Sequence, residues 1–180
     1  MPIEVVDVSL DKYLELLRRG EGHFSEFKST NVSPARLTRT LSGFSNADGG
    51  ELFVGIEDGT EPLRERWAGF DIVESANGHV QAFEQFFPLA TYFRYDFLRC
   101  PELPGLILHC EVSKTPDVRN ASDGKAYLRR GAQNIVQDTD EKLVRLRLNK
   151  GITSYEDHIV NTAILLRRAP ETRLSVIHQP

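Results

Sequence analysis

The spacing of apolar residues along the chain predicts an irregular succession of helices and strands. Apolar residues that recur every three or four positions indicate a helix with one buried face, and short alternating or continuous apolar runs indicate strands. Helices are predicted over residues 9–19, 33–47, 80–87, 140–150 and 155–168, and strands over residues 24–28, 51–56, 92–98, 106–112 and 125–130. Because the two kinds of element alternate irregularly, we predict an α+β fold with a mixed β-sheet flanked by helices.

Local signals mark the ends of the first two predicted helices. Ser9 is a suitable N-cap for the first helix, and Gly20 is a suitable stop after it. Ser33 and Pro34 open the second helix, because serine caps helices and proline is favoured in the first turn. The Asp-Gly-Gly sequence at residues 48–50 ends this helix and leads into the next strand.

The length of the chain fits one domain of ordinary size. Its 180 residues are 40% hydrophobic and 27% charged, which is typical of a globular protein. We assign residues 1–150 to this domain, and residues 151–180 to a C-terminal helix and tail that packs on the domain or on a partner. Residues 169–180 are weakly patterned, as in a flexible end or a fragment of a longer protein.

The composition argues against several classes of protein. No apolar run approaches the roughly 20 residues of a membrane span, and the start of the chain lacks a signal-peptide pattern, so a cytoplasmic protein is expected. The two cysteines and five histidines have no zinc-binding spacing. The net charge of −4 argues against a passive nucleic-acid coat, but not against a nuclease whose acids bind a cation.

Two glutamates, Glu21 and Glu26, lie around a short segment that could line a cleft. Glu26 is placed between Phe24 and Phe27 in a predicted strand, five residues after Glu21. Side chains five apart on a regular strand point to opposite faces, so the carboxylates meet only if the chain bends at Gly22. The alternative is that both are solvated surface acids.

Lys28 is expected to share a face of this strand with Glu26, because side chains two residues apart point the same way. An acid and a lysine in this arrangement are common in metal-dependent nucleases. There the acid holds the metal, and the lysine orients water or offsets the charge of the phosphate. The alternative is a surface lysine.

Asp58 is a third candidate acid, at the end of the next predicted strand. The Asp-Gly pair at this point also fits an ordinary hairpin turn, and Glu57 competes with Asp58 as a ligand. If Asp58 meets Glu21 and Glu26, the three carboxylates form a divalent-metal site that acts on phosphate.

A basic and aromatic segment at residues 125–131 is a candidate nucleic-acid contact. On a strand Lys125, Tyr127 and Arg129 would point one way, and Arg130 would point the other way. Such a face could bind a phosphate backbone, or it could be the solvated edge of a sheet.

Taken together, these segments resemble the Schlafen-type AlbA domain. The family pattern is a glutamate, a Glu-Phe-Lys block, a helix ending in Ala-Phe-Ala-Asn-x-x-Gly-Gly and a strand ending in Gly-Val-x-Asp. A block with an aromatic residue, an arginine and a glycine follows. The chain has the corresponding blocks, in the same order, at Glu21 and at residues 26–28, 43–50, 55–58 and 127–131.

The resemblance implies an α+β fold long described as DNA-binding, which vertebrate Schlafens use as a metal-dependent endoribonuclease on tRNA and rRNA. It implies that Glu21, Glu26 and Asp58 are the catalytic and metal-binding acids, with Mg or Mn as the cofactor, and that Lys28 is the family lysine. Vertebrate Schlafens pair two such lobes and hold zinc. This chain has one lobe and no zinc ligands in pattern, so we expect a homodimer or a partner domain to complete an RNA-binding groove.

Three functional hypotheses follow, of which the third is a nucleotide-binding or assembly domain of a larger defence complex, which would bind ATP although the sequence has no Walker-type loop. The first is a Mg- or Mn-dependent endoribonuclease that cleaves structured RNA, with tRNA preferred over rRNA as substrate. Its RNA backbone would be seated by Lys125, Tyr127, Arg129 and Arg130. Alanine in place of Glu26 would then abolish cleavage and leave the fold intact. The second is a non-catalytic DNA-binding module of a transcription regulator or larger defence protein, whose binding survives removal of divalent cations and falls steeply with salt.

Overall fold

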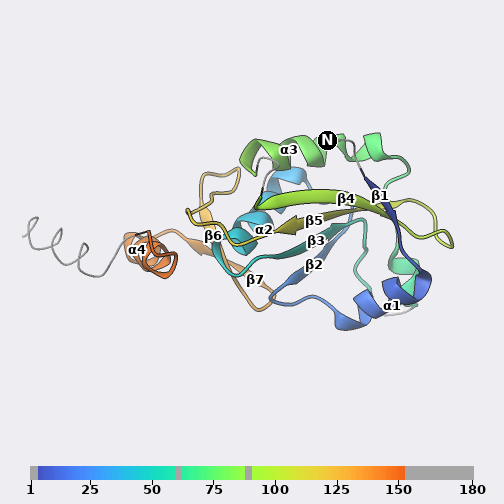
Figure 1. Ribbon diagram of the computed structural model, residues 1–180, viewed down its shortest axis with the longest axis horizontal. Helices are drawn as coiled ribbons and strands as arrows, with labels where there is room; N and C mark the ends of the chain where they lie inside the picture. Colours follow the sequence, from blue (N-terminus) through green and yellow to red (C-terminus); the bar gives the residue numbers. More distant parts are fainter. Residues whose placement is uncertain (1–3, 60–61, 88–90, 153–180) are drawn as a thin grey trace, which may run out of the picture.

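The computed structural model describes residues 4–59, 62–87 and 91–152 (Figure 1). Its strands are β1 (Val5–Asp7), β2 (Ser25–Lys28), β3 (Gly50–Val54), β4 (Phe93–Arg99), β5 (Leu106–Val112), β6 (Ala126–Arg130) and β7 (Gln133–Gln137). Its helices are α1 (Leu10–Arg19), α2 (Pro34–Asn46), α3 (Asn77–Phe86) and α4 (Asp140–Asn149), with short 3-10 helices at Leu63–Arg66 and Val73–Ala76.

Five of the strands form one mixed sheet in the order β1-β4-β5-β3-β2, and β6 and β7 form a separate antiparallel hairpin. The outer strands run parallel to their neighbours, β1 to β4 and β2 to β3, whereas β5 is antiparallel to both β3 and β4. The hairpin packs against α2, mainly through β6. The predicted α+β fold with a mixed sheet is therefore confirmed.

Most predicted elements are present, with ends shifted by a few residues. Two strands were not predicted. β1 has only three residues, and the Gln-Asn-Ile-Val-Gln sequence of β7 lacks the apolar alternation of a half-buried strand. No helix or strand was predicted between residues 56 and 80, where the two 3-10 helices lie. The helix predicted over residues 155–168 lies outside the described residues, as does all of 153–180.

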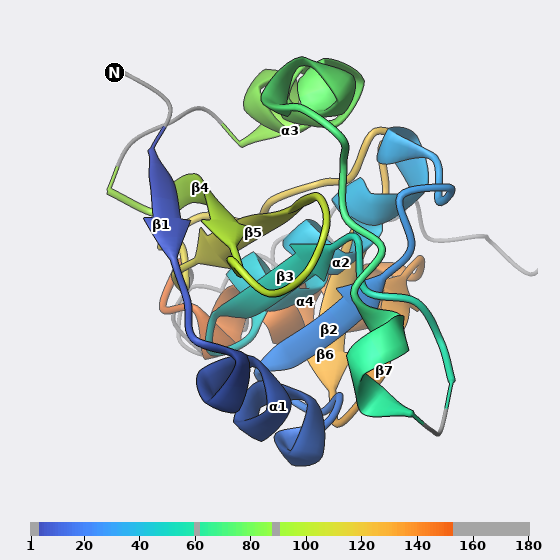
Figure 2. The same cartoon turned by 90° about the vertical axis from the view of Figure 1, so that its right-hand side faces the viewer.

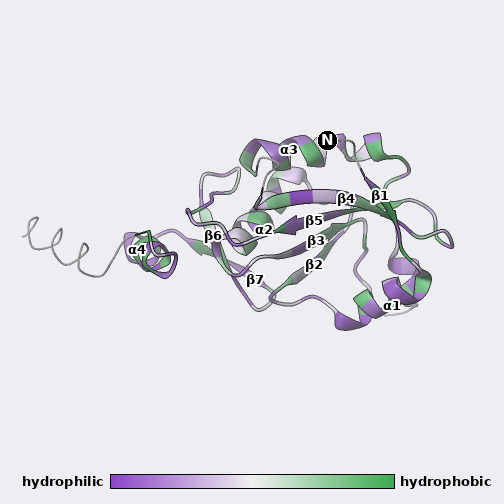
Figure 3. Ribbon diagram, viewed as in Figure 1, coloured by the Kyte–Doolittle hydropathy of each residue, from purple (hydrophilic) through white to green (hydrophobic). Residues whose placement is uncertain are grey.

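Helices cover both faces of the sheet (Figure 2), and each face has its own apolar core. The core under α2 and α3 includes Leu41, Phe44, Leu52, Phe83 and Phe97. The core under α1 includes Tyr13, Leu17, Phe27, Phe53 and Trp67. Hydrophobic and hydrophilic residues mix along α1 (Figure 3), as expected of a helix with one face in water. None of the helices in the described ranges has the length and apolar composition to cross a membrane.

A lysine joins the end of α4 to the end of α2. The Nζ atom of Lys150 donates hydrogen bonds to the carbonyl oxygens of Ser45, at 2.9 Å, and of Thr115, at 2.6 Å. Burial lowers the pKa of Lys150 to about 8. The ammonium thus bonds to the carbonyl of Ser45 in the last turn of α2, where helix carbonyls lack partners within the helix, and ties it to Thr115 in the loop after β5.

A largely enclosed histidine joins three strands on the α1 face of the sheet. His109 of β5 bonds through Nδ1 to Asp96 of β4, at 3.0 Å, and through Nε2 to Glu51 of β3, at 3.2 Å. Its ring also stacks on Phe53, with the ring centres 4.6 Å apart. Burial acts to lower the pKa of His109, but the two carboxylates outweigh it and raise this pKa to about 9. The imidazole is therefore charged at neutral pH.

Stability should fall as the pH rises through the titration of His109. A pKa raised from 6.5 to about 9 adds stability that is fully present below pH 6.5 and is lost by about pH 9. We expect this loss to be on the order of 2 kcal/mol. Urea unfolding of the wild type and of His109→Gln at pH 6, 7.5 and 9 gives the difference between their free energies of unfolding. The change of this difference with pH measures the loss. A difference that is the same at all three pH values would contradict the prediction.

Candidate functional site

Strand β2 presents Glu26 and Lys28 on one face, as their spacing predicts. Glu26 is paired with Leu52 and Lys28 with Val54 of β3, and these two apolar residues belong to the core under α2. The carboxylate of Glu26 is largely enclosed, with 8% of its side chain exposed, whereas 28% of the Lys28 side chain is exposed. Phe27 points to the opposite face and packs against Phe53.

The bend that Glu21 requires is present before β2. Residues 21–24 form bends, and the strand begins only at Ser25. Gly20 has a φ of 71°, a backbone conformation that favours glycine, and the N–H of Gly22 donates to the carbonyl of Ser25 at 2.9 Å. The bend turns Glu21 back along the strand, so that its Oε1 accepts a hydrogen bond from the backbone N–H of Phe27 at 2.9 Å.

Lys28 holds the two glutamates together. Its Nζ lies 2.8 Å from Oε1 of Glu26 and 3.1 Å from Oε1 of Glu21, and it donates to the carbonyl of Phe27 at 2.7 Å. Burial acts to lower the pKa of Lys28, but the two carboxylates outweigh burial and raise it. The site therefore contains a fixed positive charge between two carboxylates.

Arg129 of β6 is buried in the protein and does not face solvent. Its side chain is fully enclosed, and one NH2 group donates to Oε2 of Glu26 at 2.5 Å and to the carbonyl of Gly22 at 2.6 Å. The guanidinium also contacts the Phe44 ring and donates to Oδ1 of Asn134 at 3.2 Å. The prediction that Arg129 seats a nucleic-acid backbone is therefore wrong, because its side chain is fully enclosed and its head group is hydrogen-bonded within the fold.

The other residues of the basic segment are placed differently. Tyr127 points toward α2, as Arg129 does. Its hydroxyl donates to Asp123 at 2.7 Å, and its ring lies under the guanidinium of Arg39. Lys125, just before β6, and Arg130 are both exposed. The expected common face of Lys125, Tyr127 and Arg129 is thus divided between the interior and solvent.

One pocket of about 430 Å³ brings part of the predicted site together. We call it the site pocket, and its lining includes Glu26, Lys28, Arg36, Arg39, Asp58 and Tyr127. Asp58 reaches it from the segment that follows β3, as predicted. Arg36 and Arg39 were not singled out from the sequence, although their spacing of three residues places them on one face of α2.

Two other residues that could have contributed to the site, Glu57 and His23, pair with side chains outside the site pocket. Glu57, the competitor of Asp58, accepts a hydrogen bond from the hydroxyl of Ser29 at 2.6 Å. His23, which lies between Glu21 and Glu26 in the sequence, pairs with Asp48 at 3.1 Å. Neither residue lines the site pocket.

The acids of the site suit a hard divalent cation by their chemistry, because Mg and Mn prefer carboxylate oxygens. Glu21 and Glu26 already converge on a cation, the ammonium of Lys28, and Asp58 lines the site pocket together with Glu26. Within the described ranges, no group of three or more His, Cys, Asp or Glu residues is arranged to hold a metal ion. The three acids therefore do not form a metal site in this arrangement, and the position between Glu21 and Glu26 is taken by Lys28.

The fold is similar to that of a solved bacterial protein. The crystal structure of the DIP2311 protein from Corynebacterium diphtheriae matches 69% of this chain with a TM-score of 0.52 and 18% sequence identity. The chain spans 27% of the length of that protein, so the likeness concerns one part of a larger molecule. At this identity the match supports the fold alone.

A sequence comparison identifies the family. No curated protein matches the chain. The profile of the Schlafen AlbA_2 family matches residues 21–138, more than half of the chain, from Glu21 to the residue after β7. This range contains the site pocket and the glutamates around Lys28. The chain therefore belongs to the Schlafen AlbA_2 family, which supports a nuclease-like or nucleic-acid-binding domain.

Proposed function

We propose that this domain binds structured RNA, tRNA in the first instance, and cleaves its backbone in a Mg- or Mn-dependent reaction. The observation that carries the proposal is the composition of the site pocket. Two acids, Glu26 and Asp58, and three cationic side chains, Lys28, Arg36 and Arg39, line one cavity. A phosphodiester needs cations to neutralise it, and carboxylates to hold a cation or accept a proton while it is cleaved.

Each group then has a defined role. Arg36 and Arg39 on the exposed side of α2 seat the phosphate backbone. Glu21, Glu26 and Asp58 are the residues that would hold the cation. When bound, it would supply charge neutralisation at the scissile phosphate and a more acidic water. Lys28 is displaced from the two glutamates and offsets the negative charge of the phosphate.

A second lobe is part of the proposal. The site pocket is small compared with a folded RNA, and two exposed cations, Lys125 just before β6 and Arg130 at its end, flank the strand that supplies Tyr127 to the pocket. We propose that a second copy of the chain, or a partner domain, completes the groove that holds the RNA.

The second candidate function is a non-catalytic DNA-binding module. It is favoured by the ion pairs of Lys28, because an ammonium already holds the position between Glu21 and Glu26 that a metal would take. In this case Arg36 and Arg39 bind the backbone, and the carboxylates only position Lys28. Binding would then persist in EDTA and weaken steeply with salt.

Asp58 provides the most direct test of catalysis. Glu26 is unsuitable, because its removal leaves Arg129 buried without its carboxylate, so the expectation that alanine at this position leaves the fold intact is not supported by the structure. Asp58 is exposed and has no hydrogen bond or ion pair among the described residues. Asp58→Asn should lower tRNA cleavage in Mn or Mg by at least about 100-fold without changing the unfolding midpoint.

Asp71→Asn is the matched control, because Asp71 is also exposed but lies away from the site pocket. Cleavage is measured with labelled tRNA in Mn, Mg and EDTA, and binding of the same tRNA and of duplex DNA is measured in EDTA. Cleavage by Asp58→Asn at the rate of Asp71→Asn would overturn the assignment of Asp58. No cleavage by the wild type, with DNA bound in EDTA, would support the binding module instead.

A further inference from the structure

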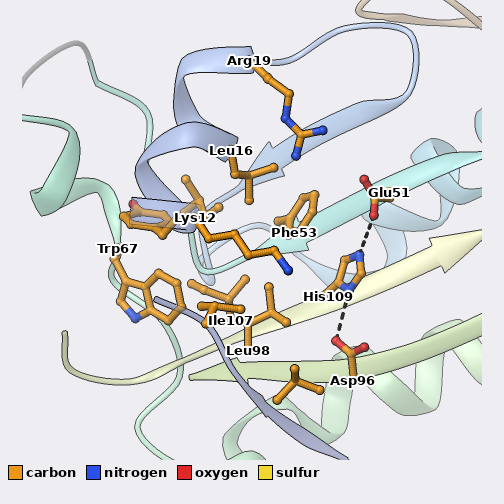
Figure 4. Close-up of a pocket in the computed structure, with 14 residues that line it drawn as sticks. Lys12, Leu16, Arg19, Glu51, Phe53, Trp67, Asp96, Leu98, Ile107 and His109 are labelled. Atoms are coloured by element: carbon orange, nitrogen blue, oxygen red, sulfur yellow. Dashed lines mark hydrogen bonds and ion pairs between the residues drawn. The ribbon is translucent and has the colours of Figure 1, made fainter. Parts of the chain in front are cut away.

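A second pocket lies on the opposite face of the sheet, between α1 and the strands (Figure 4). Its volume is about 260 Å³, just below the range of roughly 300–1,000 Å³ that is usual for small-molecule sites. We call it the α1 pocket. Its walls are mainly apolar and aromatic and include Leu16, Phe53, Trp67, Leu98 and Ile107.

The α1 pocket is separate from the site pocket, and the two share no lining residue. The pleat of β3 explains the separation, because successive side chains point to opposite faces. Phe53 faces the α1 pocket, whereas Leu52 and Val54 lie in the core under α2. A ligand of the α1 pocket therefore does not compete directly with a backbone bound in the site pocket.

One end of the α1 pocket is polar, and part of its negative charge is neutralised by a neighbouring side chain of the protein. His109 bonds to Glu51 and Asp96 through its two ring nitrogens, so neither nitrogen is available to a ligand (Figure 4). The charged imidazole with its two carboxylates leaves a net charge of −1. This group acts as a rigid wall, because each member is held by another.

Two cationic side chains of α1, those of Lys12 and Arg19, line the same pocket. Figure 4 shows both reaching from the helix toward the space beside Phe53. Within the described part of the chain, neither side chain has an ion pair or a hydrogen bond, but the charge of Arg19 helps to lower the pKa of Glu51. Added to the histidine group, they give the pocket a net charge of +1 and two free donors next to an aromatic wall.

We propose that the α1 pocket binds a small organic monoanion with an aromatic body, such as an aromatic carboxylate. The aromatic body would pack against Phe53 and Trp67, in the enclosed apolar part of the pocket. The anionic group would lie at the α1 side, where Lys12 and Arg19 supply the two donors. Charge and shape together favour this ligand over a neutral one, which leaves both cations unpaired, and over a dianion, which Glu51 and Asp96 repel.

The chain contains a built-in reporter for this site, because Trp67 is its only tryptophan and lines the pocket. The probe ligand is 3-phenylpropanoate, and the uncharged 3-phenylpropanamide is the control ligand. Trp67 fluorescence, excited where the probe does not absorb, and calorimetry report binding. We expect a Kd below about 1 mM for the carboxylate and at least tenfold weaker binding of the amide.

Variants separate this site from non-specific binding. Lys12→Met and Arg19→Met should each weaken binding of the carboxylate about threefold to fivefold, as the loss of an exposed charge contact does. Arg18→Met is the matched control, because Arg18 is exposed on the same helix and does not line the pocket. Leu16→Phe fills the cavity and should abolish the fluorescence change.

Several results would overturn the proposal. They are equal binding of carboxylate and amide, tighter binding of octanoate than of 3-phenylpropanoate, and equal affinities of the Lys12, Arg19 and Arg18 variants. A wild-type dimer that Leu16→Phe converts to a monomer would assign the pocket to a second copy of the chain. None of these results depends on RNA cleavage. The proposed ligand of the α1 pocket can therefore be wrong while the proposed nuclease function is right, and the nuclease function can be wrong while the ligand is right.

Discussion

Arg129→Met should destabilise the protein by about 3–5 kcal/mol, the usual cost of removing one partner of a buried ion pair. Methionine fills much of the space of the arginine stem, so the loss comes mainly from the head group. Without it, Oε2 of Glu26 loses its partner at 2.5 Å, and the carbonyl oxygens of Gly22 and Ser25 lose a shared donor. Urea unfolding at neutral pH measures the effect.

Arg130→Met is the control for this prediction, because Arg130 is the exposed neighbour on β6 and should cost less than about 0.5 kcal/mol. Arg129→Lys should recover only part of the loss, since one ammonium cannot reach both the Glu26 carboxylate and Asn134. Adding Glu26→Gln to Arg129→Met should cost less than the sum of the two single changes. Equal unfolding midpoints for Arg129→Met and Arg130→Met would contradict the role assigned to the buried pair.

Asn46→Asp should be the other strongly destabilising substitution, at about 3 kcal/mol or more at pH 7. Asn46 at the end of α2 is 2% exposed. Its Nδ2 donates to the carbonyl oxygens of Arg119, at 2.7 Å, and Tyr127, at 2.9 Å, and its Oδ1 accepts from the N–H of Arg119. An isosteric carboxylate would replace these two donated bonds, and a longer one to Oγ of Ser42 at 3.3 Å, with a buried charge facing two carbonyl oxygens.

The cost of Asn46→Asp should shrink at low pH, because a protonated carboxyl group can restore one of the two donated bonds. Asn120→Asp provides the comparison at each pH, since Asn120 is exposed in the loop that precedes β6. The measurement is the difference in unfolding free energy between these two variants at pH 7 and pH 4. The same difference at both values would show that the buried amide does not have the assigned role.

The sequence predicted the contacts that depend on local periodicity. Glu26 and Lys28 share a face because strand side chains alternate, and Glu21 joins them because the chain bends after Gly20. Asp58 could be placed near them, since β2 and β3 are neighbours and run parallel, so that both lead to the same edge of the sheet.

The features that the sequence did not predict depend on contacts between distant segments. The alternation of residues 125–130 shows which side chains share a face, but not whether that face meets solvent or α2. Arg129 was therefore placed at the surface, whereas it is buried against Glu26, 103 positions earlier in the chain. The α1 pocket was also not predicted, because Lys12, Phe53, Trp67 and His109 converge on it from four elements or loops.

The buried pair of Glu26 and Arg129 also has a consequence for how such domains can diverge. A domain that lost its chemistry during evolution could replace the exposed Asp58 at little cost to folding. Replacement of Glu26 would require a compensating change at Arg129, on a different strand, to avoid an unpaired buried charge. We therefore expect inactive descendants to retain the Glu-Phe-Lys block and to differ first at the aspartate, so that the block alone is a poor marker of catalysis.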